Sequence, residues 1–566
     1  MDGNPLKPEG TIMAPDFSVS GGQNESNPAG SVVSSPPEPQ SLAPESLSEM
    51  TSPAGQTSSP EINQTSSQPG PSAVSESAPA SIPETFVVPT ADLSNPPESP
   101  PSAPVITENP LIPQGIAPVQ PVQNPGGKSS LPGRILMVMV FLFLAVGLFF
   151  GGRFLMGMIA GPQKTTLTYW GLWEDNPVLE GVLADFEKQS PNVTVSYIKQ
   201  SPQQYRERLQ AAIDRGQGPD VFRFHNTWIA MLRNELSTVP ATIMTPSEFS
   251  STFYPVAVTN LVAGQTIYGI PMEIDGLGLY YNEDLFAAAG VTPPSTWEDV
   301  LNMVPKLTVK NGTTITTSAI ALGTAGNVEN FSDILATMMM QNGASLLTPT
   351  TKEAQEALTF YRKFADPSDP VYTWNDTLDN SIYAFANSKV AMILAPSWRA
   401  FDIKQMNPNL HFKTVPIPQL PGSTINWASY WVEGVSAKSQ HQKEAWQLVK
   451  YMTSRDVVTR LYTEEAKVRL FGEPYARTDL ASTITADPYV GAFIKEAPTA
   501  KSFPLASRTF DNGLNDKLIK YLTDAVNGLA AGSAPGAVLQ TMSSGFTQVL
   551  SQYGLVTGAP APSASP

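Results

Sequence analysis

The sequence predicts an α/β fold for the part of the chain that follows residue 164. Strand-like and helix-like segments alternate there, at residues 167–170, 177–188, 192–198, 205–215 and 219–224. The helical segments carry apolar residues at helical spacing, whereas the strand segments are short and apolar or alternating. Strands that alternate with helices favour a parallel sheet covered by helices. All nine Trp and all 17 Tyr also follow residue 164, so this part has the material for a core.

The first 132 residues have a different composition. They contain 26 of the 54 prolines and no Trp or Tyr. Residues 1–127 carry 13 acidic side chains against one basic side chain, which is −12 of the total net charge of −16. Such a segment cannot bury enough apolar area to offset the entropy lost on ordering. We therefore expect residues 1–132 to be a disordered, acidic tail rich in Pro and Ser. Residues 557–566 are expected to form a flexible C-terminal tail.

An apolar run follows the tail. Residues 135–150 include 14 large apolar side chains and no charge. At about −0.3 to −0.6 kcal/mol each, these side chains favour membrane insertion by roughly 4–8 kcal/mol. Arg153 opposes insertion by at most ~3 kcal/mol and by less near a helix end. The sequence therefore predicts a transmembrane helix over residues 133–160, because a helix continued to Ile159 is long enough to cross a bilayer.

The flanking charges are nearly balanced across this predicted helix, with Lys128 and Arg134 before it and Arg153 and Lys164 after it. A run that begins so far from the start is not a cleavable signal peptide. We expect a signal-anchor, with the tail in the cytoplasm and the globular domain outside the cell membrane. The chain has no Cys, which excludes disulfides and a lipid-modified Cys, so the helix is the expected anchor.

The most informative segment lies near the middle of the chain. Residues 269–282 (GIPMEIDGLGLYYN) carry a loop, an acidic side chain and an apolar strand, and Pro294-Ser-Thr-Trp297 then begins a capped helix. This order is typical of a crossover between two lobes. It resembles the crossover of the family 1 extracellular solute-binding proteins, the sugar-binding relatives of the maltose-binding protein.

Four further segments resemble motifs of that family in the same order along the chain. They are residues 186–193 (FEKQSPNV), 216–221 (GQGPDV), 384–393 (AFANSKVAMI) and 434–451, which pairs a strand with a helix. Asn387 and Ser388 depart from the pattern, because the family usually has a glycine there. The matches together cover nearly 400 residues.

The resemblance implies a two-lobed periplasmic-binding-protein-like fold with a hinge over residues 164–556. The first lobe would hold residues 165–272 and 398–455, and the second lobe residues 276–394 and 460–556. A ligand would bind in the cleft between the lobes, and closure would be a hinge motion.

A sugar presents hydroxyl groups and apolar C–H faces, so its site needs aromatic side chains together with planar hydrogen-bonding groups. The resemblance implies nine ligand-binding candidates in loops at strand ends: Trp173, Glu174, His225, Asn226, Asp275, Trp398, Arg399, Tyr430 and Trp431. Asp275 has the alternative role of capping the hinge, and His225 that of a hydrogen-bonded surface residue. Strand alternation allows only one of Tyr430 and Trp431 to face the cleft. Phe510 and Asp511 are weaker candidates.

Several classes of function lack support in the sequence. No Gly-x-Ser-x-Gly elbow or paired-carboxylate motif indicates a hydrolase. The three His are isolated, so no metal site is expected, and no glycine-lysine loop for a nucleotide is present. The acidic balance argues against a nucleic-acid partner.

The sequence thus favours a membrane-anchored solute-binding component of an ABC importer, which binds a mono- or oligosaccharide and delivers it to separate permease subunits. The resemblance implies no catalysis and no cofactor. The alternatives are a membrane-tethered ligand sensor or a surface carbohydrate-binding protein of the same fold, and, more remotely, a glycoside hydrolase.

Overall fold

The computed structural model of the protein describes residues 137, 139–150 and 164–556, and residues 139–150 are helical. Within these ranges, no helix has both the length and the hydropathy that crossing a bilayer requires. The transmembrane helix predicted over residues 133–160 extends beyond the described helix at both ends. The predicted tails at residues 1–132 and 557–566 lie outside the described residues.

Residues 164–556 contain two α/β lobes, each built around its own sheet. The first sheet has the strand order β2-β1-β3-β14-β4, and β7 also pairs with β14. Its strands are β1 (Thr165–Gly171), β2 (Val193–Lys199), β3 (Val221–His225), β4 (Leu236–Ser237), β7 (Ile270–Pro271) and β14 (Trp431–Ser436). The pairs of β1 with β2 and β3 are parallel, which confirms the predicted parallel arrangement, but β14 joins β3 in antiparallel fashion.

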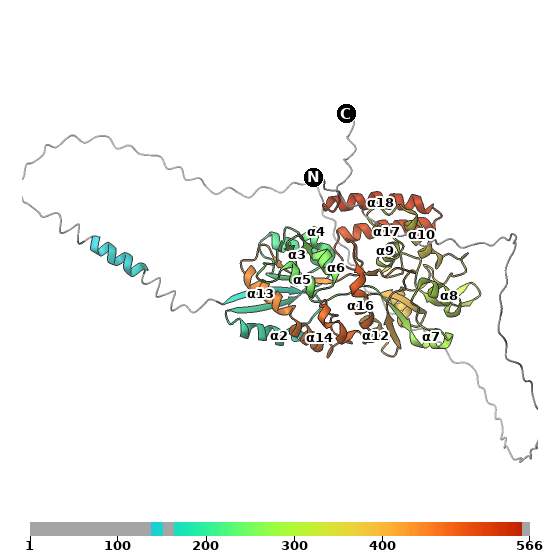
Figure 1. Cartoon of the computed structure of the whole chain (residues 1–566), viewed down its shortest axis with the longest axis horizontal. Coiled ribbons are helices and arrows are strands. Elements are labelled where there is room, and N and C mark those ends of the chain that lie inside the picture. Colours follow the sequence, from blue (N-terminus) through green and yellow to red (C-terminus); the bar gives the residue numbers. More distant parts are fainter. Residues whose placement is uncertain (1–136, 138, 151–163, 557–566) are drawn as a thin grey trace, which may run out of the picture. The chain divides into compact units, whose positions relative to one another are not determined.

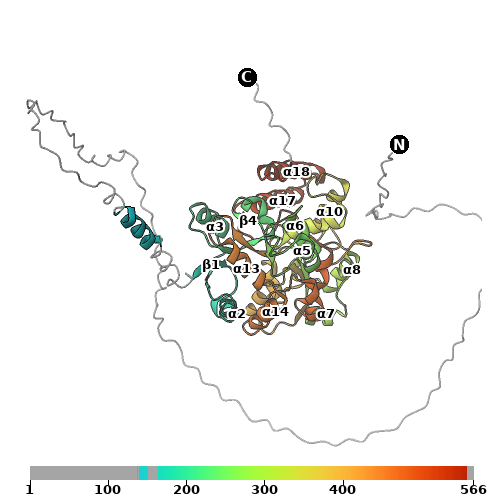
Figure 2. The same ribbon diagram turned by 60° about the vertical axis from the view of Figure 1, so that its left-hand side comes forward.

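Helices cover this first sheet. They are α2 (Asn176–Gln189), α3 (Tyr205–Asp214), α4 (Ile229–Leu232), α5 (Pro246–Thr252), α6 (Pro255–Leu261), α13 (Gln442–Met452) and α14 (Arg455–Glu465). A small hairpin of β5 (Val262–Ala263) and β6 (Thr266–Ile267) follows α6. Helix α14 packs beside α2, as Figure 2 shows. The last residues of α14 therefore lie with the first lobe, and the start at residue 460 that the sequence predicts for the second lobe is too early.

The second sheet has the order β12-β8-β11-β10-β9. Its strands are β8 (Gly278–Asn282), β9 (Val309–Asn311), β10 (Thr314–Ile320), β11 (Val390–Ala395) and β12 (Phe412–Val415). Strand β12 pairs with β8 over four residues. The sequence-based assignment of residues 398–415 to the first lobe is therefore wrong, because pairing with β8 places this segment in the second lobe.

The second lobe holds the other α-helices of residues 164–556, and Figure 1 shows α7, α8 and α10 in the opposite half of the domain from α2, α3 and α13. They are α7 (Glu283–Ala289), α8 (Trp297–Leu307), α9 (Phe331–Gln341), α10 (Lys352–Lys363), α11 (Ser381–Ala386), α12 (Arg399–Met406), α15 (Ala481–Ile484), α16 (Gly491–Glu496), α17 (Leu514–Ala530) and α18 (Pro535–Gln552). Helix α18 lies along α17, and both contact α10.

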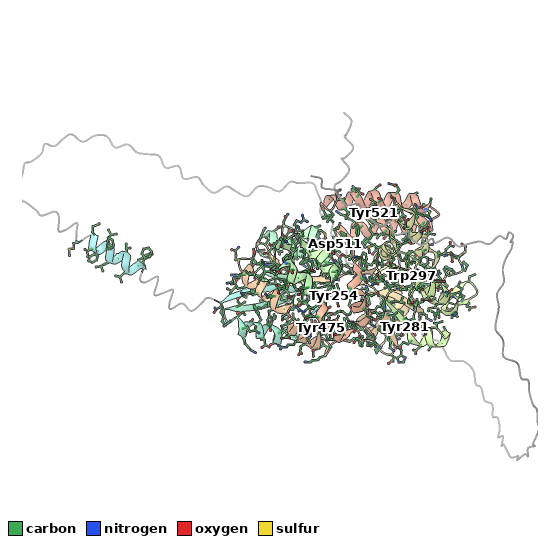
Figure 3. All side chains as sticks on the ribbon, in the orientation of Figure 1. Tyr254, Tyr281, Trp297, Tyr475, Asp511 and Tyr521 are labelled. Atoms are coloured by element: carbon green, nitrogen blue, oxygen red, sulfur yellow. The ribbon has the colours of Figure 1, made fainter. Side chains whose placement is uncertain are left out.

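The predicted cap at the start of α8 is present, and it is a capping box. The Asp299 N–H donates to Thr296 Oγ1 at 3.1 Å, and the Thr296 N–H donates to Asp299 Oδ2 at 2.9 Å. Trp297 is buried, and its Nε1–H donates to Gln341 at 2.7 Å, so it has a structural role in the second lobe. Figure 3 places Trp297 within the second lobe.

Segments from three distant parts of the chain meet between the lobes. The crossover, residues 272–277, forms isolated bridges from Glu273 to Tyr475 and from Gly276 to Ala428. Ala428 follows β13 (Asn426–Trp427), which pairs with β15 (Ala500–Lys501). The crossover is therefore held on both sides, and it positions the acidic residues that it carries.

We predict that Gly276→Ala destabilises this crossover. A Cβ atom at this position would lie 1.9 Å from the backbone oxygen of Trp427, so one of the two segments must move. Overpacking of this kind costs about 1–3 kcal/mol. Urea unfolding measures the change. Gly326→Ala is the matched control, because its added Cβ meets only Asp376 Oδ1, at 3.7 Å; an equal effect in both variants would contradict the prediction.

Candidate ligand-binding site

A cavity of about 500 Å³ lies between the two lobes, which is a volume typical of small-molecule sites. Its lining comes from the first lobe, from the crossover and from the second lobe. Within the lining, the residues that carry the argument are Trp173, His225, Glu273, Asp275, Asn330, Asp333, Trp398, Arg399, Trp431, Arg469, Glu473, Arg508 and Phe510.

The first lobe contributes an aromatic wall. The ring centroids of Trp173 and Trp431 are 5.5 Å apart, and those of His225 and Trp431 are 5.1 Å apart, both in edge-to-face contact. The His225 ring nitrogens lie 2.8 Å from Thr227 Oγ1 and 3.1 Å from Ser429 Oγ. Burial lowers the pKa of His225 to about 3, so its imidazole is neutral. This wall offers flat apolar faces and fixed edges to a ligand.

The second lobe contributes Trp398, which is 38% exposed and lies immediately before α12. The Arg399 guanidinium carbon is 4.1 Å from the centroid of the Trp398 ring. Arg399 is itself fixed by Glu329 at 2.6 Å and Asp402 at 2.7 Å. The Trp398 ring is therefore packed against an arginine that two ion pairs hold in place, and it lines the cavity.

Asp275 ties the crossover to the loop after β11. Its Oδ1 accepts from the N–H of Gly276 at 2.8 Å and of Ser397 at 3.1 Å, and its Oδ2 accepts from Ser397 Oγ at 3.0 Å. Burial raises its pKa to about 7 despite these hydrogen bonds. The carboxyl group thus serves the hinge role that the sequence left open for it, and it also lines the cavity.

The floor of the cavity is charged. Glu273 accepts from the Trp431 N–H at 3.1 Å and shares a hydrogen bond with Glu473, and burial raises the pKa of Glu273 well above its usual range. Burial opposes ionisation of Glu473 as well, but Arg469 Nη2, 2.9 Å away, and the bond to Glu273 lower its pKa. Glu273 is therefore the member of the pair that is more easily protonated.

Polar groups of the second lobe complete the lining. Asp333 accepts from the N–H and the hydroxyl of Ser507, and burial raises the pKa of this carboxyl group to about 6. Asn330 Nδ2 donates to Ser507 Oγ at 2.7 Å, whereas Asn330 Oδ1 is buried without a partner in the described part of the chain. That oxygen is available to accept a hydrogen bond from a ligand.

The structure brings six of the nine predicted residues to the cavity: Trp173, His225, Asp275, Trp398, Arg399 and Trp431. As strand alternation requires, Trp431 faces the cavity and Tyr430 does not. Tyr430 is fully buried, and its hydroxyl donates to Asn260 at 3.0 Å. Of the weaker candidates, Phe510 lines the cavity, whereas the Asp511 carboxylate accepts from the N–H groups of Gly513 and Asn515 at the start of α17.

Glu174 and Asn226 also lie away from the cavity lining. Glu174 forms a buried ion pair with Arg223 at 2.7 Å. The Asn226 side chain accepts from the Tyr430 N–H at 3.1 Å and donates to Asn260 at 3.1 Å. Asn226 directly follows β3 and Glu174 lies three residues after the end of β1, but both side chains are buried.

Sequence reasoning missed several polar residues of the lining: Glu273, Asn330, Asp333, Arg469, Glu473 and Arg508. Glu273 could have been found, because it lies two residues before Asp275 on the same crossover. The others lie on segments with no motif that points to a cleft.

The family model of the bacterial extracellular solute-binding proteins matches residues 171–459, about half of the chain. A relative in Streptococcus mutans, the multiple sugar-binding protein, is 24% identical over 318 residues, which cover 53% of this chain and 74% of the relative. A second relative, the putative ABC transporter periplasmic-binding protein YcjN of Escherichia coli, is 26% identical over 200 residues, which cover 33% of this chain and 45% of that relative.

Solved structures share the fold. The sugar-binding protein MalE from Xanthomonas citri is 22% identical with a TM-score of 0.55, and the match covers 69% of this chain and 98% of that one. A cyclo/maltodextrin-binding protein in complex with maltotetraose is 17% identical with a TM-score of 0.56, at the same coverage. The family and the fold are those of binding proteins and not of enzymes. With a family match over half of its length and the two-lobed fold around an interlobe cavity, this chain belongs to the bacterial extracellular solute-binding protein family.

Proposed function

We propose that the protein is the solute-binding component of an ABC importer and that it binds a sugar or oligosaccharide in the cavity between its lobes. The observation that carries the proposal is the pairing of aromatic rings from both lobes, Trp173 and Trp431 on one side and Trp398 on the other, around a cavity with buried hydrogen-bonding groups. Aromatic faces match the C–H faces of a sugar, and carboxylates and amides match its hydroxyl groups.

The names of similar proteins agree with this ligand class. The relative in Streptococcus mutans is a multiple sugar-binding protein, and a structural neighbour from Thermotoga lettingae holds α-D-tagatose. A ligand that contacts both lobes binds the closed state better than the open state, so it shifts the hinge equilibrium towards closure. The closed form is then the form that separate permease subunits recognise.

We predict that Trp398→Ala weakens sugar binding by more than ten-fold with little effect on stability. The ring is partly exposed at the cavity, so its removal deletes a ligand contact without opening the core. Each aromatic contact contributes roughly 0.5–1.5 kcal/mol beyond the buried area. Isothermal titration calorimetry gives the dissociation constant, and thermal unfolding monitors the fold. Tyr383→Ala, an exposed aromatic substitution outside the cavity lining, is the control.

If Trp398→Ala binds the sugar with the affinity of the unaltered protein, Trp398 is not a ligand contact. If all variants and the unaltered protein fail to bind any saccharide, the proposed ligand class is wrong.

We also propose that residues 133–160 anchor the domain to the outer face of the cell membrane as a signal-anchor. The support is the charge-free run of 14 large apolar residues between positions 135 and 150. Protease added to intact cells should then degrade the domain after residue 161 and leave the N-terminal tail intact, with lysed cells as the control. Degradation of the tail alone would reverse the orientation, and release of the whole domain without protease would exclude the anchor.

A further inference from the structure

Beneath the floor of the cavity lies a buried cluster of carboxylates, built in two halves. In the first half, Arg223 is paired with Glu174 and with Glu433, each at 2.7 Å, and all three side chains are 2% exposed. In the second half, Arg469 is paired with Glu465 at 2.7 Å and with Glu473 at 2.9 Å. Single carboxylate oxygens of Glu174, Glu465 and Glu473 all lie within 4.8 Å of one another, so the two halves meet.

The cluster has more acidic groups than its arginines can neutralise. Glu273, hydrogen-bonded to Glu473, is a fifth carboxyl group beside the two guanidinium groups. Full ionisation would leave three uncompensated negative charges in a buried region. Each buried, unpaired charge costs several kcal/mol. Protons or a bound cation must therefore supply the missing positive charge.

Two carboxylate oxygens in the cluster lack a hydrogen-bond partner among the described residues, one on Glu433 and one on Glu174. Glu174 is 4% exposed, and its Oε1 accepts from Arg223. Its Oε2 is buried and has no partner in the part of the chain that the structure describes. A buried hydrogen-bond acceptor normally has a partner, because an acceptor without one lowers the stability by about 1–3 kcal/mol. The cost is larger when the group is charged. This oxygen is the second indication, besides the charge count, that the cluster receives a positively charged ligand.

We propose that Glu174, Glu465 and Glu473 bind a divalent cation, with Ca²⁺ as the preferred ion. Carboxylate oxygens are hard ligands of the type that Ca²⁺ takes at about 2.3–2.6 Å, so oxygens on opposite sides of one ion lie up to about 5 Å apart. The observed spacing of the three oxygens is within this limit. A charge of +2 offsets two of the three excess charges, whereas a monovalent ion offsets only one.

The ion would enter from the cavity, because Glu473 and Arg469 line it. Arg469 remains paired with Glu465 and Glu473, and its positive charge reduces the attraction for a cation. We therefore expect an affinity in the range of extracellular calcium modules, with a dissociation constant of roughly 10⁻⁴–10⁻³ M. The bound ion would join the loop after β1 to the end of α14 and to the segment beside the crossover.

The sequence could not indicate this site. It predicts no metal centre, since its three His are dispersed and it has no Cys. Glu174 lies almost 300 residues before Glu465 and Glu473, and the three glutamates follow no ligand spacing. Only folding brings their oxygens together.

Calorimetric titration of the full chain, purified in detergent and stripped of metal with a chelator, tests the proposal with CaCl₂ and no saccharide present. We expect one Ca²⁺ per chain and a rise in the unfolding temperature. Glu465→Gln and, separately, Glu174→Gln should each weaken Ca²⁺ binding at least ten-fold. Glu464→Gln, a neighbouring substitution at a more exposed residue that pairs with Lys467, should leave it unchanged.

Absence of Ca²⁺ binding to the unaltered protein at millimolar CaCl₂ would overturn the proposal and leave protons as the neutralising charges. Ca²⁺ binding that both Gln variants retain at full strength would place the ion elsewhere and also overturn it. Since the titration contains no saccharide, its outcome is independent of whether the proposed solute is correct.

Discussion

Arg223→Met is expected to lower the free energy of unfolding by about 3–5 kcal/mol, the largest stability effect that we predict for a single substitution. Arg223 lies on β3 and is 1% exposed, and it pairs with Glu174 and Glu433. Methionine fills a similar volume but removes the positive charge. Two carboxyl groups then remain buried without a cation, which is the costly arrangement.

Chemical denaturation of the full chain, followed by tryptophan fluorescence, measures this loss. Arg455→Met is the matched control, because Arg455 forms an exposed pair with Asp479 at 3.3 Å. Exposed pairs contribute about 0–1 kcal/mol, so the control should change little. Equal losses in the two variants would show that the buried network does not hold the first lobe together.

The second large effect concerns the dependence of stability on pH. Burial raises the pKa of Asp275 from an ordinary 3.8 to about 7, with the like charge of Glu473 adding to the shift. Glu496, another buried acid, interacts with the same carboxyl group. Because the native state holds the proton more tightly than the unfolded state, the contribution is fully present below pH 3.8 and is lost as the pH rises through 7.

A shift of this size corresponds to about 4 kcal/mol of stability lost between the two pKa values. Asp275→Asn keeps the shape of the side chain and one acceptor oxygen for Ser397 but does not titrate. The free energy of unfolding of the Asn variant should therefore fall less steeply between pH 4 and pH 7 than that of the unaltered protein. Parallel pH profiles for the two proteins would mean that Asp275 is ionised in the native state.

Local patterns in the sequence predicted local structure well. Apolar spacing located β1, α2, β2, α3 and β3, and the segment Pro294-Ser-Thr-Trp297 predicted the capped start of α8. These features depend on residues a few positions apart. The lobe assignment of residues 398–415 was wrong, since it depends on the pairing of β12 with β8, more than 100 residues earlier in the chain.

In the cavity, too, features set by local sequence could be predicted, whereas features set by long-range contacts could not. Its aromatic residues could be predicted, because Trp173, Trp398 and Trp431 lie close to strand ends. Which residue of a neighbouring pair faces the cavity is decided by tertiary contacts, as Glu174 and Arg223 show. Glu473 and Arg469 could not be predicted, because their place at the cavity depends on the bridge between Tyr475 and Glu273.

A thermal-shift screen of the full chain against mono- and oligosaccharides tests the proposed sugar-binding function most directly. A ligand that binds only the native state stabilises it by RT ln(1 + [L]/Kd), about 2.7 kcal/mol at a hundred-fold excess over Kd. We predict a rise in the unfolding temperature with one class of saccharide, recovered chemically unchanged, and a loss of that rise in Trp398→Ala. No rise with any saccharide would contradict sugar binding in the cavity and direct the search to other polar solutes.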